Sequence, residues 1–495
     1  MSDVYIPGVK SRFNTEKIID DLMKIERLPK EKAEKEIDSL ENRKIWWQDL
    51  GRRVSSLRES ARNLFSFQNP FNERVALSSN ENVITATATR EAGEGEYLMG
   101  VKQLAQADRF LSPPIDEKTE VKAGSYAFLA GKEEISVDFK GGSLKEFVDV
   151  LNRRGRGVIS ASFISVQPGS KSLLLESKIT GSENRLVFAE SAALLGEYLG
   201  ITGIADYGAD AGTNALKTIS AAQDAVITME GIEITRPSNT IDDIIPGVTV
   251  TARGVSDRPE RLGVQPDREG VKDSIIALVG NYNRLMAELN ILTRIDDRLV
   301  DELAYLDKDE ADAMRKRLGA FSGDATLTQF RANLLRAVSS PYPTDEEQDL
   351  SMLAQIGVST NTRGSGGYNP ARLRGYLEID EKVLDTAMEQ RLPAIRQLFA
   401  SDTDGDLLAD TGVAFNLDAL TRPLVDKGGL ISLKTGTIDS KISQDKRRID
   451  TMERQLAAKE SDLKVQYGRM ENAYARMEKM SSSLDNFSRQ NGNNR

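Results

Sequence analysis

The chain of 495 residues contains neither cysteine nor histidine. Without cysteine it has no disulfide and no thiol nucleophile, and without either residue the usual zinc sites are excluded. The lack of histidine also removes the Ser-His-Asp triad and the side chain that most often transfers protons near neutral pH. Carboxylates, lysine, tyrosine and arginine remain for catalysis, so an enzyme is disfavoured, with a two-carboxylate glycosidase as the class still open. We expect no cofactor and no metal.

Long apolar runs are absent as well. No stretch of about 18 apolar residues occurs, so we expect no membrane span. The N-terminal residues MSDVYIPGVKSRF lack the apolar core of a cleaved signal peptide, which leaves export without signal cleavage open. The net charge of −10 and the lack of a basic face argue against a nucleic-acid partner.

What the chain does contain is a sevenfold repeat of apolar residues near its C-terminus. The run 438–487 has no proline and predicts a helix about 75 Å long. Such a helix exceeds the width of a small domain, so its stripe must be buried against other long helices. The repeat consists of Ile442, Ile449, Leu456, Leu463, Met470, Met477 and Leu484.

Two further segments predict long helices with the same repeat. One spans Lys30 to Phe67, and the other begins near Glu269. A shorter helix is expected before the first of these, capped by Thr15 and ended by Pro29. We expect the stripes of the long helices, and the first part of the C-terminal stripe, to bury one another in a coiled-coil-like leg bundle. The packing residues expected in this bundle are Leu40, Trp47, Val54, Leu57, Val271, Leu278, Leu285, Leu292, Ile442, Ile449, Leu456 and Leu463.

The middle of the chain has a different character. Alternation over Val83–Thr89 and short glycine-bounded runs up to about Asp257 predict β-strands. Ser143 with Glu146 predicts a capping box that opens a short helix. The same pattern at Thr240 and Asp243 predicts one helical turn ahead of a Pro246-Gly247 turn.

These observations predict an α+β multidomain fold. The long terminal helices form the leg bundle, and two central β-rich head domains follow, one inserted in the other. The expected order is a flexible or short helical segment (1–29), a leg helix (30–72), a discontinuous β-rich domain (73–112 and 206–265) with an inserted β-rich domain (113–205), a helical leg domain (266–437), a coiled-coil helix (438–487) and a disordered tail (488–495).

An acidic loop and one tryptophan each allow two interpretations. Residues 401–410 resemble a calcium loop, but Leu407 and Val413 stand where an EF-hand needs glycine and glutamate, so we predict a solvated acidic turn. Trp46 points about 100° away from Trp47 along a helix. It therefore covers a third helix or lies in a subunit interface.

The last part of the C-terminal stripe is predicted to face another molecule. The row three residues further on contains Asp445, Lys459 and Gln466, which disfavours a tight homodimer. We expect the first part of the helix to pack on the N-terminal and third helices of its own chain. The candidate intermolecular contacts are Trp46, Met470, Met477, Met480 and Leu484.

The segment Thr85–Phe110, TATATREAGEGEYLMGVKQLAQADRF, resembles the flagellar filament capping proteins, also called flagellar hook-associated protein 2 or FliD. A second segment, Ser238–Val250, is similar to the Asn-Thr-Ile-x-Asp…Ile-Pro-Gly-Val-Thr stretch of that family. In place of the small-residue run with which the family often opens, this chain has Pro7–Asn14. The family positions matched in the first segment are Gly95, Tyr97, Val101, Gln103, Leu104 and Ala105.

The resemblance implies a structural protein rather than an enzyme. It implies a homo-oligomeric ring, a pentamer, that caps the distal end of the flagellar filament, retains exported flagellin and promotes its folding. The implied partners are flagellin, hook-associated junction proteins, the flagellar type III export apparatus and an export chaperone. The implied location is the flagellar tip, extracellular or periplasmic. The alternatives are another flagellar axial or junction protein and a non-flagellar coiled-coil scaffold.

Overall fold

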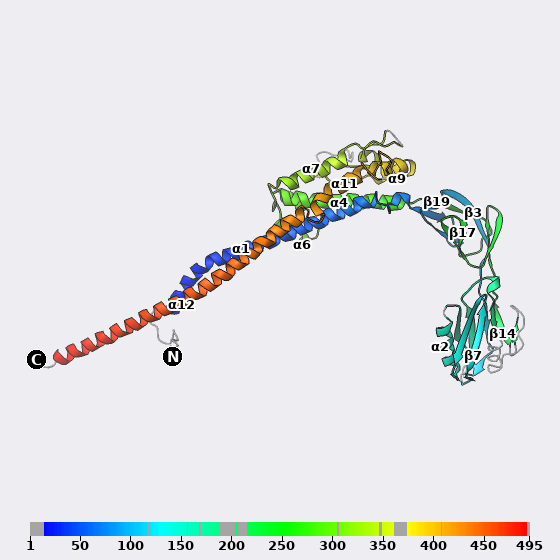
Figure 1. Ribbon diagram of the computed structural model, residues 1–495, viewed down its shortest axis with the longest axis horizontal. Coiled ribbons are helices and arrows are strands. Elements are labelled where there is room, and N and C mark those ends of the chain that lie inside the picture. Colours follow the sequence, from blue (N-terminus) through cyan, green and yellow to red (C-terminus); the bar gives the residue numbers. More distant parts are fainter. Residues whose placement is uncertain are drawn as a thin grey trace. The chain divides into compact units, whose positions relative to one another are not determined.

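The computed structural model describes residues 14–116, 118–155, 157–167, 170–188, 203–205, 215–303, 306–345, 349–360, 374–406 and 408–492. The chain forms two compact units. The helical unit comprises Met1–Asn69 and Arg268–Arg495, and the β-rich unit comprises Pro70–Asp267. The expected fold class, with long terminal helices and a central β-rich region, is confirmed (Figure 1). Among the described residues, no helix is both long enough and apolar enough to cross a bilayer.

The helical unit is built on two long helices, α1 (Thr15–Asn63) and α12 (Leu430–Gly492). Helix α1 packs against α12, α4 and α11. A two-stranded ribbon of β20 (Val358–Ser359) and β21 (Glu378–Ile379) lies in the same unit. The shorter helices are α4 (Arg268–Thr293), α5 (Arg298–Asp301), α6 (Lys308–Lys316), α7 (Ala325–Ser339), α9 (Glu381–Gln390), α10 (Leu392–Phe399) and α11 (Val413–Val425).

Helix α1 corrects the expectation that Pro29 ends a separate N-terminal helix, because it runs straight through this residue. Proline cannot donate to the carbonyl of Ile25 and crowds it. Ile25 and Leu28 are 66% and 57% exposed, so the turn containing that carbonyl is open to solvent. The residue at the N-cap is Asn14 rather than Thr15, and the helix ends at Asn63. The rest of the expected segment 1–29, residues 1–13, lies outside the described residues.

Helix α12 is longer at both ends than the expected coiled-coil helix. It begins at Leu430, within the segment assigned to the preceding domain, and continues through 488–492, where a disordered tail was expected. In the polar start the threonine hydroxyls find acceptors within the helix: Thr435 and Thr437 each donate to a carbonyl four residues back. Ile431 is 9% exposed and packs on Gly51 of α1, which anchors this end.

The β-rich unit contains two larger and several smaller sheets. The five-stranded sheet has the order β1-β19-β3-β15-β16, and β17-β18-β2 form a three-stranded sheet. These strands are β1 (Arg74–Ser78), β2 (Ile84–Ala88), β3 (Gly95–Gln103), β15 (Ala225–Met229), β16 (Ile232–Arg236), β17 (Thr240–Ile245), β18 (Val248–Ala252) and β19 (Glu260–Pro266).

The remaining strands lie between β3 and β15 in the chain. One sheet has the order β10-β11-β4-β14-β13, with β5 also paired to β11, and two others are β12-β7-β8 and β6-β9. Helix α2 (Leu144–Arg154) starts with the predicted Ser143–Glu146 capping box, which is confirmed. The strands are β4 (Arg109–Leu111), β5 (Ile115–Asp116), β6 (Glu120–Val121), β7 (Gly124–Ala130), β8 (Glu133–Phe139), β9 (Gly142–Ser143), β10 (Ile159–Gln167), β11 (Ser170–Ser177), β12 (Leu186–Phe188), β13 (Gly203–Ala205) and β14 (Ala215–Ser220).

Two separate clusters of buried side chains fill this unit. One runs from Phe110 to Leu216 along the chain, and the other takes its residues from before and after that stretch, between Val83 and Val264. Phe110 lies in the first cluster, although the expected boundary assigned it to the outer domain. The expected boundary between 205 and 206 adjoins residues outside the described part. We keep the division into an outer and an inserted β-rich domain as a proposal.

The segment 238–250 corrects a second expectation. Thr240–Ile245 is strand β17 rather than a helical turn, and it pairs with β18 across Pro246 and Gly247. The capping pattern is overridden because Ile241 and Ile245 are both buried at 3% exposure. Asp243 pairs with Arg236 at 2.9 Å instead of capping a helix. Gly247 has φ +76, as the predicted turn requires.

Candidate functional site

Helices α1 and α12 lie side by side in antiparallel directions (Figure 1). The contacts between them join the start of one helix to a late part of the other, and they advance in opposite directions along the two sequences. Three ion pairs have short distances between nitrogen and oxygen: Lys30–Glu453 at 2.7 Å, Glu36–Lys441 at 2.7 Å and Lys44–Asp439 at 2.6 Å. The hydroxyl of Thr15 also donates to the carboxylate of Glu471.

The seam between these helices is only partly closed. On α1 it buries Ile19, Met23, Ala33 and Ile37 to 7% exposure or less. Leu40 of α1 is half-buried. On α12, Ile442 is 7% exposed, while Ile449, Leu456 and Leu463 are half-buried. Two helices alone leave the flanks of an apolar stripe open to solvent, because the stripe on each helix is wider than the contact line.

The C-terminal part of α1, from Trp47 onward, is enclosed by other helices of the same unit. Trp47, Val54 and Leu57 are 3% exposed or less. The residues expected to pack on them from α4 are also 3% exposed or less: Val271, Leu278, Leu285 and Leu292. Besides α1, the main partner of α12 is α11 rather than α4, which corrects the expectation that α12 packs on the third helix.

Helix α11 was not expected from the sequence, and charged residues bind it to α1. Asp418 is 1% exposed, and its two carboxylate oxygens accept hydrogen bonds from Arg58 at 2.9 Å and Arg422 at 2.6 Å. A buried carboxylate is stable only when such partners compensate its lost hydration. Pro423 inside α11 masked the helical pattern, although Val413, Leu417 and Leu424 do carry a helical spacing.

A second buried ionic group lies between α4 and α1. Glu288 of α4 is 2% exposed, and its Oε1 lies 3.0 Å from Nη1 of Arg317. The same Arg317 nitrogen lies 3.2 Å from Asp49 of α1. Burial raises the pKa of Glu288, while the charge of Arg317 opposes that rise. The sequence offered no signal for this pair, because the residues are far apart in the chain.

Both tryptophans of the chain contact Phe321. The rings of Trp47 and Phe321 are stacked with centroids 4.6 Å apart, and Trp46 meets Phe321 edge-on at 6.5 Å. The Nζ atom of Lys434 of α12 lies over the Trp47 ring, 5.5 Å from the ring centroid. Phe321, between α6 and α7, covers one side of Trp46. The rest of the Trp46 side chain is accessible, since this residue is half-buried.

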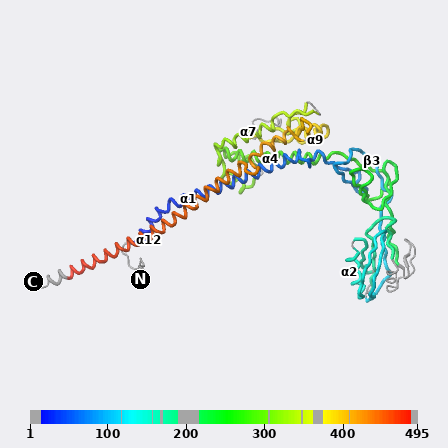
Figure 2. Tube along the Cα trace, viewed as in Figure 1, coloured from blue at the N-terminus to red at the C-terminus, as the bar shows by residue number. Residues whose placement is uncertain are grey.

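The last part of α12 extends past the beginning of α1 (Figure 2). Three of the candidate intermolecular contacts lie on this extension and are strongly exposed: Met477 at 63%, Met480 at 68% and Leu484 at 68%. Met470, the residue before the Glu471 contact, is 50% exposed. All four continue the apolar stripe that α1 covers in the earlier part of α12. Arg469 and Arg476, seven residues apart, flank the stripe and are exposed.

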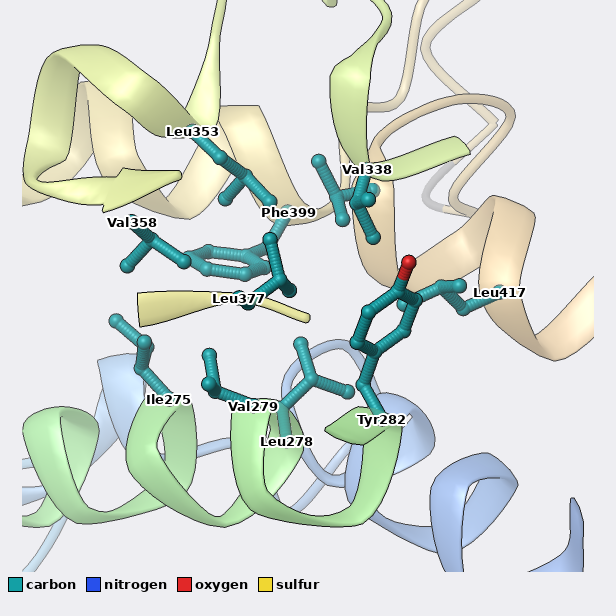
Figure 3. A pocket seen from close by; sticks show the side chains of 11 residues that line it. Ile275, Leu278, Val279, Tyr282, Val338, Leu353, Val358, Leu377, Phe399 and Leu417 are labelled. Carbon is teal, nitrogen blue, oxygen red and sulfur yellow. The ribbon is translucent and has the colours of Figure 1, made fainter. Parts of the chain in front are cut away.

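A cavity of about 10 Å³ lies in the core of the helical unit (Figure 3). Tyr282 of α4 reaches into it, and its hydroxyl has no hydrogen-bond partner among the described residues. Burial raises the pKa of this hydroxyl. The space would hold one water, but a water needs two to four polar partners, and the other side chains are apolar. They are Ile275, Leu278, Val279, Val338, Leu353, Val358, Leu377, Phe399, Val413 and Leu417.

The acidic loop brings three carboxylates together. One oxygen of each of Asp402, Asp404 and Asp410 lies within 4.8 Å of the others. Backbone amides already use them: Gly405 donates to Asp402 at 2.6 Å, and Thr403 donates to Asp410 at 2.9 Å. These are the bonds of a tight polar turn, which is the interpretation favoured by the sequence.

Comparison with known proteins identifies the family. Residues 11–108 match the family model described as the N-terminus of flagellar hook-associated protein 2, and residues 222–479 match the model of its C-terminus. Flagellar hook-associated protein 2 of Treponema maltophilum is 30% identical and covers 91% of this chain and 94% of its own length. The protein of the same name from Treponema pallidum (strain Nichols) is 27% identical, covering 89% and 93%.

Solved structures support the fold. The crystal structure of the D1-D2-D3 domains of the flagellar cap protein FliD from Escherichia coli aligns with a TM-score of 0.53. It covers 80% of this chain and 99% of that one at 22% sequence identity, a likeness that speaks for the fold alone. The two family models and the relative from Treponema maltophilum show that the chain belongs to the flagellar hook-associated protein 2 family.

Proposed function

We propose that this chain caps the distal end of the flagellar filament as a homo-oligomeric ring, retains exported flagellin and promotes its folding and incorporation. A filament-cap role is the one that the family carries. The observation that best supports it is the antiparallel pair of terminal helices, which holds both chain ends in one unit and leaves part of α12 uncovered by α1. The role is structural, with no catalytic step.

The proposed partners are further copies of the chain in a pentameric ring, flagellin, hook-associated junction proteins, the type III export apparatus and an export chaperone. The proposed location is outside the cytoplasm at the filament tip, either extracellular or periplasmic. The half-buried Trp46 and the exposed stripe Met470, Met477, Met480 and Leu484 are the surfaces we assign to contacts with other molecules.

The charges beside the exposed stripe favour a particular partner helix. Arg469 and Arg476 are on one flank, and an antiparallel pair of two such tails would bring these arginines together. A helix with an apolar stripe and acidic flanks would pair with them instead. Methionine side chains adapt to differently shaped partners, which suits contacts that are made and released.

Deletion of the gene tests the cap function. We expect short or absent filaments and loss of flagellin to the medium, with both defects corrected by the full-length chain. Normal filaments in the deletion strain would contradict the proposal. Immunogold labelling separates it from the alternative of a junction protein, because the label should lie at the filament tip and not at the hook junction. Electron microscopy of the purified protein should show a ring.

Truncation tests the exposed end of α12. A chain ending at Glu471 keeps the contact with Thr15 and removes the part of α12 beyond α1, with Met477, Met480 and Leu484. We expect it to unfold at the same temperature as the full chain but to lose export or capping. A control chain ending at Gly492 should behave as the full chain does. Global unfolding of the shorter chain would contradict the division of α12 into an internal and an external part.

A further inference from the structure

The chain has twelve methionines and no cysteine, so methionine carries its sulfur redox chemistry. The exposures of these methionines differ widely. Met470, Met477 and Met480 are 50%, 63% and 68% exposed, and they share one stripe of α12. By contrast, four others are at most 2% exposed: Met23, Met99, Met286 and Met388.

We propose that Met470, Met477 and Met480 form an oxidation site whose conversion to sulfoxides prevents a partner helix with an apolar stripe and acidic flanks, which would pair with Arg469 and Arg476, from docking on α12. The oxidant is a peroxide of the hydrogen peroxide class. Each thioether sulfur takes one oxygen atom from the peroxide, which is reduced to water, so no further reactant is needed. The docking half of this inference, that sulfoxides block a partner helix, rests on the proposed function. The chemical half, that these three methionines are oxidised first, does not.

Position decides why these three side chains react together. Oxidation of methionine follows the access of the oxidant to sulfur. Met477 and Met480 lie beyond the start of α1, and Met470, one residue before the contact at Glu471, is still 50% exposed. Sulfurs of the buried methionines are enclosed by packed side chains, and the oxidant reaches them only when the surrounding structure opens.

Position also decides the consequence. Met470 and Met477 are one heptad apart, and Met480 follows three residues later, so all three sulfoxides appear on the face that continues the α1–α12 seam. A sulfoxide oxygen is a strong acceptor, and burying it in an apolar helix interface without a donor is unfavourable. One modified face therefore loses its apolar character at three points at once.

Mass spectrometry tests the chemistry on the full-length folded protein. The protein is incubated with graded hydrogen peroxide, digested and mapped by peptide. We expect the protein to gain three oxygen atoms first, on Met470, Met477 and Met480, before Met352, which is 37% exposed. The four buried methionines should react only after unfolding in guanidinium. Equal reaction of buried and stripe methionines, or protection of the stripe, would overturn the proposal.

A triple variant tests the consequence. Met470→Leu, Met477→Leu and Met480→Leu together keep the stripe apolar and remove its sulfur, and Met352→Leu is the control. Filaments are sheared and regrow in the presence of peroxide. Regrowth of each strain is expressed as a fraction of its own regrowth without peroxide. We expect this fraction to fall in wild type and in the control at peroxide concentrations that leave it unchanged in the triple variant.

Equal loss in the wild type and the triple variant would overturn the docking half of the inference. If the wild-type chain supports no regrowth even without peroxide, the cap function itself fails and the docking half fails with it. The peptide map still decides the oxidation site in that case. A melting temperature for the triple variant matching wild type shows that the substitutions leave the fold intact.

Discussion

The hydroxyl of Thr15, in the first turn of α1, donates a hydrogen bond to the carboxylate of Glu471, 456 residues later in the chain. Thr15 is only 6% exposed, so the contact marks the place where the start of α1 closes on α12. Everything in α12 up to this point runs along α1, and the residues after it do not. The same contact divides the long C-terminal stripe into a part covered by α1 and a part that is not.

The register of the two long helices can be tested by exchanging charges. Glu453 raises the pKa of Lys30 through a hydrogen bond, and both side chains lie at the solvent edge of the seam. Lys30→Glu should lower the melting temperature by placing like charges together, and Glu453→Lys should do the same. The double exchange should restore most of the loss at low salt and less at high salt.

The matched control for this exchange is a pair within one helix. Asp21 and Lys24 of α1 form an ion pair at 2.9 Å, and their charged neighbours, Lys17 and Asp20, also lie on α1, so exchanging them leaves the α1–α12 contacts in place. A double exchange of Lys30 and Glu453 that restores nothing would contradict the antiparallel alignment described above.

Tyr282→Phe is expected to stabilise the helical unit. The substitution removes a buried hydroxyl without a described partner, and such a group costs about 1–3 kcal/mol. We expect the free energy of unfolding to rise by about 1 kcal/mol or more. Urea unfolding followed by tryptophan fluorescence measures this unit selectively, because both tryptophans of the chain lie in α1.

Tyr342→Phe is the control for Tyr282→Phe. Tyr342 is also buried, but its hydroxyl donates to the carbonyl of Ala337 at 2.8 Å. Its removal should lower the free energy of unfolding by about 1 kcal/mol, the usual net contribution of one hydrogen bond. If Tyr282→Phe lowered the free energy of unfolding as Tyr342→Phe does, the Tyr282 hydroxyl would have a hydrogen-bond partner.

The buried pair of Glu288 and Arg317 should show a distinct pattern of substitutions. Arg317→Met leaves the Glu288 carboxylate buried without its partner and should cost about 3–5 kcal/mol. Adding Glu288→Gln removes the unpaired charge and should recover much of that loss. Chemical denaturation of the three variants measures both steps. A double variant as unstable as Arg317→Met alone would mean that the pair contributes through packing only.

Glu288 also predicts a pH dependence. Its pKa is raised in the folded protein by burial, so the folded state holds this proton more tightly than the unfolded state. The contribution of Glu288 to stability is therefore full below its unfolded pKa and falls as the pH rises toward its folded pKa. Subtracting the stability of Glu288→Gln from that of wild type at a series of pH values above the ordinary glutamate pKa of about 4.3 isolates it. A difference that grows with pH would contradict the raised pKa.

Asp108 is predicted to hold strand ends together in the β-rich unit. This carboxylate is 3% exposed and accepts hydrogen bonds from the amides of Leu186 at 2.7 Å and Ala222 at 2.6 Å. Asp108→Asn replaces one acceptor by a donor facing an amide, which should cost about 1–3 kcal/mol. Hydrogen exchange should become faster at Leu186 and Ala222. Asp116→Asn, at an exposed turn, is the control and should change neither amide.

Local patterns anticipated many of the elements. The strands around Val83–Thr89 and the helix opened by Ser143 follow from alternation and capping within a few residues. The same kind of reasoning failed at Thr240–Asp243, where buried Ile241 and Ile245 make a strand more favourable than a capped turn. The same reasoning also failed at Pro29. A proline in an exposed turn destabilises a long helix, but packing against α12 stabilises α1 by more than this cost.

The sequence by itself determined that long apolar stripes exist at both ends of the chain, that the middle is β-rich, and that sulfur redox chemistry belongs to methionine. Only the tertiary structure decided which stripe meets which. A stripe records that a face must be buried but not by what, so the choice of α11 over α4 as a neighbour of α12 was not readable from the repeats. The register came from contacts between distant residues such as Thr15 and Glu471, and these contacts exist only once the two helices lie side by side.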